Sequence, residues 1–324
     1  GNPHEEAYDG ATAVADFDND GFLDIVVTTR ADKNKSNQGN GALYIWNPRT
    51  GKVMNKNLIN SFLPHSTIAR TASGPSVPFI GDIDNDGEPE ICLSARNMMY
   101  AYDYDASTGT LTLKWSKPTT DSSAATTMVL FDFNQDGSSE LVYRDRSHLR
   151  ILNGMDGNDL ITPIECSSAT GSECPLVADI NGDGSAEILV TGGLSGTDAW
   201  TGYLRVFSSN PAGAWAPARK VWNQFAYNAV HINEDLTIPP YQINPATVFP
   251  GKDGIPGTAD GVRPYNNFLQ QQTTLSKDGT PLWLTPNGQL TGVHAFKYDV
   301  LKDSMSITLE IYNAGAAAFQ PPFH

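Results

Sequence analysis

The nonapeptide DFDNDGFLD at residues 16–24 decides the fold of this chain, because close variants of it return three times. The variants are DIDNDGEPE at 82–90, DFNQDGSSE at 132–140 and DINGDGSAE at 179–187. All four have oxygen-bearing side chains at positions 1, 3, 5 and 9, a glycine at position 6, and an apolar run on each side. We interpret them as one metal-binding loop, repeated, with a β-strand before and after it.

Calcium is the cation that this pattern fits. It takes about six to eight oxygen ligands, and a glycine at position 6 permits the sharp turn that lets alternate side chains converge on one ion. A main-chain carbonyl at position 7 and the acid at position 9 would complete the shell. The competing interpretation, an EF-hand, requires a glutamate at position 12 between two helices. Position 12 is Val27, Leu93, Tyr143 or Val190, and the flanking segments read as strands, so the EF-hand interpretation fails.

The chain is acidic, with 21 basic and 36 acidic residues among 324 and a formal net charge of −15. This balance argues against nucleic acid or an anionic membrane surface as a partner. Fifteen of the acidic residues fall inside the four nine-residue loops, so metal ligation accounts for much of the surplus. Hydrophobic residues make up 40%, which indicates a globular chain, and no apolar run is long enough to predict a membrane span.

The sequence divides into four similar units of short strands when it is aligned on the four acidic loops. The fourth unit, for example, reads PLVAD, EILVTGG, GYLRVFSS and WAPARKVW. The later loops recur at about the length of one propeller blade, whereas the first spacing is lengthened by an insert at 33–41 and a Pro/Ser-rich link at 64–78. Repeated units of four short strands predict an all-β fold, a β-propeller of four-stranded blades.

The loop and its strand context resemble the FG-GAP and VCBS repeats, which build the β-propellers of integrin α-subunits and of many bacterial secreted and surface proteins. The resemblance covers about residues 8–222 and implies about four bound Ca²⁺ ions. The implied ligands, site by site, are Asp16, Asp18, Asp20, Phe22 and Asp24; Asp82, Asp84, Asp86, Glu88 and Glu90; Asp132, Asn134, Asp136, Ser138 and Glu140; and Asp179, Asn181, Asp183, Ser185 and Glu187. Sites three and four have an amide at position 3 and are expected to be weaker.

The sequence divides into three predicted parts. Residues 1–222 hold the four blades, and 223–290 form a degenerate blade or a connector packed on the propeller. Residues 291–324 alternate like the first strands of an immunoglobulin-like or adhesion-type sandwich, which two strands cannot complete alone. The tract at 221–227 and the phrase at 265–268 are similar to segments that follow such repeats in large bacterial secreted proteins. Since closed propellers have about four to eight blades, we favour a fragment of a longer polypeptide over a small closed propeller.

Two further expectations concern individual side chains. Cys166 and Cys174 lie close in sequence between two strand patterns, and both a disulfide and two free thiols remain open. Trp46, Trp115 and Tyr102 fall in alternating strand patterns, which favours burial in the core or between blades.

No catalytic motif accompanies the repeats: the six histidines form no HExxH pair, and no G-x-S-x-G turn occurs. We therefore expect a non-catalytic, calcium-stabilised module, secreted or on the cell surface, that binds a protein or carbohydrate partner. The long loops 31–41, 192–202 and 240–265 are the candidate contact surface. The rival interpretation is a carbohydrate-active enzyme, because some polysaccharide lyases, notably rhamnogalacturonan lyases, resemble this scaffold. A third is an architectural spacer in a large surface protein.

Overall fold

A computed structural model describes residues 8–30, 43–55, 75–95, 97–121, 123, 125–171, 173–194, 202–211, 213–249, 259–273, 288–299 and 304–313. These residues form β-strands and one short 3-10 helix, η1, at Ala229–His231. The strands, in chain order, are β1 Tyr8–Ala15, β2 Asp24–Arg30, β3 Leu43–Asn47, β4 Lys52–Val53, β5 Phe79–Gly81, β6 Glu90–Ala95, β7 Met98–Asp105, β8 Thr110–Pro118, β9 Met128–Phe131, β10 Glu140–Arg144, β11 His148–Leu152, β12 Ile164–Glu165, β13 Leu176–Ala178, β14 Glu187–Gly192, β15 Tyr203–Phe207, β16 Gly288–Asp299 and β17 Ser304–Asn313.

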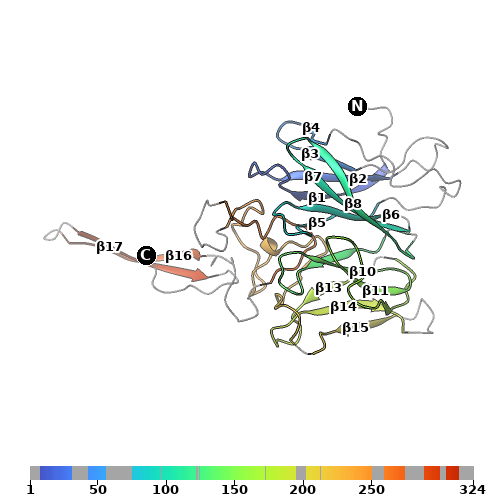
Figure 1. Ribbon diagram of the computed structural model, residues 1–324. Coiled ribbons are helices and arrows are strands. Elements are labelled where there is room, and N and C mark those ends of the chain that lie inside the picture. The colour runs from blue at the N-terminus through green and yellow to red at the C-terminus, as the bar shows by residue number, and fades with distance from the viewer. Residues whose placement is uncertain are drawn as a thin grey trace.

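The first fifteen strands form four antiparallel meanders, which are the predicted propeller blades (Figure 1). Their strand orders are β1-β2-β3-β4, β5-β6-β7-β8, β9-β10-β11-β12 and β13-β14-β15. In each blade the acidic nonapeptide joins the first strand to the second, as the sequence predicts. The all-β blade architecture is therefore confirmed.

The blades are arranged through their first strands. β1 contacts β5, β5 contacts β9, and β9 contacts β13. Among the described strands β13 makes no contact with β1, so the four blades form an arc and not a closed ring. The apolar core follows this arrangement, since one buried cluster joins the first three blades to the connector and a second lies between blades three and four.

A segment from the connector, residues 265–273, crosses the inner side of this arc. Asn266 Nδ2 donates to Asp16 O and its Oδ1 accepts from Asp16 N, both at 2.8 Å. Phe268 exchanges two main-chain hydrogen bonds with Ile80 on β5, and Leu130 N on β9 donates to Leu269 O at 3.0 Å. Gln271 Nε2 donates to Val177 O on β13 at 2.8 Å. One segment therefore bonds to all four blades and satisfies backbone groups that would otherwise be buried unpaired.

The close approach of this segment explains why Gly81 ends β5. A Cβ on Gly81 would lie 2.1 Å from Gln270 Oε1 and 2.8 Å from Leu130 Cδ1, so a larger residue would require the side chains of Gln270 and Leu130 to move. The predicted boundaries at 222 and 290 remain predictions, but the connector packs against the blades through residues within 223–249 and 259–273.

The predicted fourth strand of blade four is wrong. Residues 215–222 form no strand; Ala216 N donates to Phe133 O at 2.8 Å, and Ala186 N donates to Ala216 O at 3.0 Å, which places this stretch between blades three and four. Pro217 lacks the amide hydrogen that a ladder needs. Arg219 is buried and donates to Tyr227 Oη, Ala229 O and Ile232 O, so the chain turns into the connector instead.

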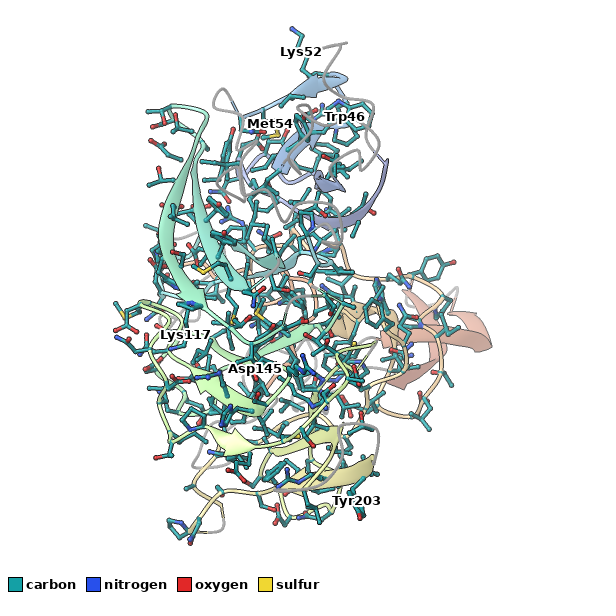
Figure 2. The ribbon with its side chains drawn as sticks, turned by 90° about the vertical axis from the view of Figure 1, so that its right-hand side faces the viewer. Trp46, Lys52, Met54, Lys117, Asp145 and Tyr203 are labelled. Atoms are coloured by element: carbon teal, nitrogen blue, oxygen red, sulfur yellow. The ribbon has the colours of Figure 1, made fainter. Side chains whose placement is uncertain are left out.

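Trp46 also differs from expectation: its side chain is 40% exposed on β3, at the far end of the molecule from Tyr203 on β15 (Figure 2). Trp115 is buried as predicted, and its Nε1 donates to Gly154 O of the next blade at 2.6 Å. Tyr102 is buried as well. The alternation of apolar and polar residues therefore locates the strands, but it does not predict whether other parts of the chain bury the outer face of a blade.

Cys166 and Cys174 are free thiols, so the disulfide alternative is not realised. Strands β16 and β17 pair in one long antiparallel hairpin that projects away from the blades (Figure 1). Within the described residues, no helix has the length and apolar character that crossing a bilayer requires.

Candidate metal sites

The four acidic loops share one backbone conformation. Positions 4 and 6 both have positive φ in every loop, a region that glycine and asparagine adopt more readily than other residues. The position-4 values are 60° at Asn19, 64° at Asn85, 59° at Gln135 and 79° at Gly182, and the position-6 values are 83° at Gly21, 90° at Gly87, 97° at Gly137 and 86° at Gly184. A common conformation in four separate blades indicates that the nonapeptide itself dictates the loop.

Hydrogen bonds from the main chain orient the acidic side chains in the same way each time. The position-1 carboxylate accepts from the position-6 amide, at 2.9 Å for Asp16, 3.0 Å for Asp82, 3.0 Å for Asp132 and 3.2 Å for Asp179. The position-5 carboxylate accepts from the position-7 amide, at 2.9 Å for Phe22, 2.8 Å for Glu88, 2.8 Å for Ser138 and 2.8 Å for Ser185. Main-chain hydrogen bonds within each loop thus orient the acids at positions 1 and 5.

The position-9 acid begins the second strand of each blade and is buried: Asp24, Glu90, Glu140 and Glu187 are at most 3% exposed. One oxygen of each accepts from the position-2 amide, for instance Ile83 N to Glu90 Oε2 at 2.8 Å. Burial raises the pKa of Asp24 to about 7, of Glu90 to about 9 and of Glu140 to about 7, and it raises the pKa of Glu187 as well. Without a cation, the ionised form of these acids is disfavoured.

The first two loops bring ligand oxygens together. One oxygen each of Asp16, Asp18 and Asp24 lies within 4.8 Å of the other two, and the same holds for Asp82, Asp84 and Asp86. In the second loop Glu90 Oε1 is buried and has no hydrogen-bond partner. A buried carboxylate oxygen left without a partner is costly, and a hard divalent cation with several open oxygen positions would satisfy it. The donor set of these loops therefore fits calcium.

The last two loops differ at position 3. Asn134 Nδ2 donates to Glu140 Oε1 at 3.0 Å, and Asn181 Nδ2 donates to Glu187 Oε1 at 3.0 Å. In both loops, an amide nitrogen, which does not ligate a cation, thus donates a hydrogen bond to Oε1 of the position-9 acid. In these loops a cation has to displace an internal hydrogen bond, which supports the predicted lower affinity.

Sequence reasoning missed the basic side chains beside the loops. Lys114 Nζ contacts Asp84 Oδ2, Arg49 Nη1 lies 3.2 Å from Asp20 Oδ2, and Lys220 Nζ lies 4.0 Å from Asp179 Oδ2. It also missed bonds between neighbouring loops: Asn19 Nδ2 donates to both oxygens of Glu88, at 2.6 and 2.8 Å. No local sequence signal indicates these contacts, because each joins residues about 30 or more positions apart along the chain.

Comparison with known families identifies the class. The FG-GAP-like repeat matches residues 16–93, 82–143 and 132–190, which together span more than half of the chain. The protein therefore belongs to the FG-GAP-like repeat family. None of the curated protein sequences compared with the chain matches it.

Three solved structures are similar to this chain. The biofilm matrix protein Bap1 of V. cholerae is 15% identical, with a TM-score of 0.51 over 84% of this chain and 64% of that protein. The rhamnogalacturonan lyase PL11 of Bacillus licheniformis is 15% identical over 60% of this chain and 37% of its own length, with a TM-score of 0.42. The exotype rhamnogalacturonan lyase YesX is 14% identical over 92% and 54%, with a TM-score of 0.45. Bap1 supports the fold alone, and this chain spans less than two thirds of it.

Proposed function

We propose that this chain is a calcium-stabilised, non-catalytic binding module of an extracellular or cell-surface protein, which recognises a protein or a carbohydrate. The observation that carries the proposal is the repeated loop itself, which buries an acid at position 9 in each of four blades and, in the first two, brings three carboxylate oxygens within 4.8 Å of one another. Extracellular calcium is about millimolar, which suits the weaker class of calcium sites in extracellular modules.

Calcium has a structural role in this proposal. The loops join the first two strands of each blade, and the ion would neutralise acids whose mutual repulsion and burial oppose folding. The ligand-binding surface is then formed elsewhere, in the loops that differ between blades. Of the proposed contact loops, 31–41 lies outside the described residues, as do 195–201 of the second loop and 250–258 of the third.

A binding role agrees with the chemistry at the inner side of the arc. Arg219, Tyr227 and Tyr265 lie together there, as the residues of a polysaccharide-cleaving site would, but all three are buried, and Arg219 Nη1 donates to Tyr227 Oη at 3.0 Å. Arg219 and the Tyr227 hydroxyl are thus engaged in holding the connector, and these three residues form no accessible basic cluster.

The test is a calcium titration followed by a ligand screen. Isothermal calorimetry of the chelator-treated protein should give calcium binding at about four loops. The calcium-loaded protein is then screened on glycan and matrix-protein arrays, with the chelator-treated protein as control. Calcium-dependent capture of one class of ligand supports the module. Release of unsaturated sugars from a pectin-like polymer would instead identify the protein as a polysaccharide lyase. Absence of binding on both arrays would favour an architectural spacer.

A further inference from the structure

Lys114 occupies a special place in blade two. It lies in the middle of β8, where Tyr102 pairs with Leu113 and Ala101 pairs with Trp115. Lys114 is therefore the extra residue of a β-bulge, a feature that turns a side chain out of the regular alternation of a strand. This bulge directs its ammonium group to the second acidic loop, about thirty residues earlier in the chain.

The ammonium lies among the proposed ligands of that loop. Lys114 Nζ contacts Asp84 Oδ2, the position-3 acid, and is 4.0 Å from Glu90 Oε1, the buried position-9 acid. The lysine side chain is 19% exposed and Glu90 is fully buried, so water screens the interaction weakly. Asp103 on β7 also adds a favourable charge interaction to Lys114.

We infer that Lys114 is a built-in cation for the second loop and competes with calcium there. This inference rests on the proposed calcium binding by the repeats. A Ca²⁺ ion bound to Asp84 and Glu90 would lie within a few ångströms of the ammonium, and two positive charges so close repel strongly in a partly buried site. Calcium must therefore displace the lysine before it fills the loop.

The calcium affinity of the second loop should therefore be lower than its number of acidic ligands alone would predict. The second loop has the most acids of the four, yet its own blade supplies a positive charge to it. Its geometry is then maintained when calcium is withdrawn, and blade two becomes the calcium-independent member of the arc. Arg49 and Lys220, at the first and fourth loops, are 54% and 64% exposed and can move into solvent, so they compete little.

The test removes the ammonium and keeps the length of the side chain. Lys114→Met should raise the calcium affinity of the second loop by at least about tenfold in calorimetry, because the competing charge is gone. Lys117→Met is the matched control: Lys117 is on the same strand, is 18% exposed, and pairs with Asp159 at 2.9 Å outside the acidic loops (Figure 2). It should leave calcium binding unchanged.

Assignment to the second loop uses Asp82→Asn, which should abolish the gain made by Lys114→Met. A second neutral variant, Lys114→Gln, keeps the test valid if the methionine variant folds poorly. Calcium affinities equal to those of the unaltered protein in both Lys114 variants would overturn the inference. Absence of calcium binding in every variant, including the unaltered protein, would overturn the proposed calcium function together with it, so the two failures are distinguishable.

Discussion

The first and third acidic loops have the same backbone conformation, but the surroundings of the buried position-9 carboxylate differ between them. In the first, Asp16, Asp18 and Asp24 converge with no internal donor between the last two. In the third, Asn134 donates to Glu140 and so provides the hydrogen bond that a buried oxygen requires. The first loop presents converging carboxylates that a cation can bind, whereas in the third loop the position-9 carboxylate already accepts an internal hydrogen bond. The comparison teaches that backbone conformation and metal dependence are separate properties of this repeat.

Chelation should give the largest effect and should separate the two loops. Removing calcium with EDTA is expected to lower the melting temperature by about 5–10 °C for each ion lost, since an ion at a hundredfold excess over its Kd contributes about 2.7 kcal/mol and a domain of this size shifts by about 2–4 °C per kcal/mol. Amide exchange should accelerate more at residues 16–24 than at 132–140, because the Asn134 bond remains. Mass-spectrometric hydrogen exchange measures this, and equal acceleration in both loops would contradict the distinction.

The pH dependence of the folding stability in the absence of calcium should be an effect of intermediate size. Burial raises the folded-state pKa of Asp24 to about 7, above its unfolded value of about 4. Without calcium the folded state therefore holds a proton that the unfolded state has lost, and stability falls as pH rises from about 4 to about 7. With calcium bound, the ionised form is stabilised and this fall should disappear.

Melting curves in EDTA between pH 5 and 8 measure the effect. Asp24→Asn should remove one part of this fall, because Glu90 and Glu140, whose pKa values burial also raises, still titrate in the variant. Glu187→Gln of the fourth loop should remove a smaller part. The pKa of Glu187 is raised in the same direction, but its burial penalty is accompanied by the Asn181 bond. A calcium-free protein whose melting temperature does not vary over this range would show that the acids are compensated in another way.

The smallest effect should come from converting the third loop into the first type. Asn134→Asp should raise the calcium affinity of that loop by about tenfold, because a carboxylate replaces an amide among the ligands. In EDTA the same variant should be less stable by about 1 kcal/mol, since it loses the bond to Glu140 and places a second acid beside it. Calorimetry and urea unfolding measure the two changes.

The matched control for this variant is Asn153→Asp. Asn153 Oδ1 accepts from Met155 N at 2.8 Å, an interaction that aspartate preserves, and it lies outside the acidic loops. It should change neither the calcium affinity nor the stability in EDTA. If Asn134→Asp weakens calcium binding, the amide at position 3 is itself a preferred ligand, and the proposed ranking of the loops is wrong.

The repeated nonapeptide made the blades predictable. Its glycine and acids specify a turn with local main-chain bonds, and the apolar runs on each side alternate with period two, so fold class and candidate ligands follow from adjacent residues. Prediction failed where contacts are distant. Residues 215–222 alternate like a strand but form none, and buried Arg219 bonds to the connector instead. Trp46 is exposed because it lies on the face of β3 opposite to the buried Leu43 and Ile45.

The sequence by itself determined four copies of a loop whose glycine and main-chain hydrogen bonds lie within its own nine residues, and with them the strands that the loops join. The tertiary structure decided what lies against those loops and what crosses the arc. Lys114 reaches Asp84 through a bulge in another strand, and residues 265–273 bond to all four blades from far along the chain. Hydrogen bonds and charges between distant residues depend on where the whole chain places them, and no local pattern encodes that placement.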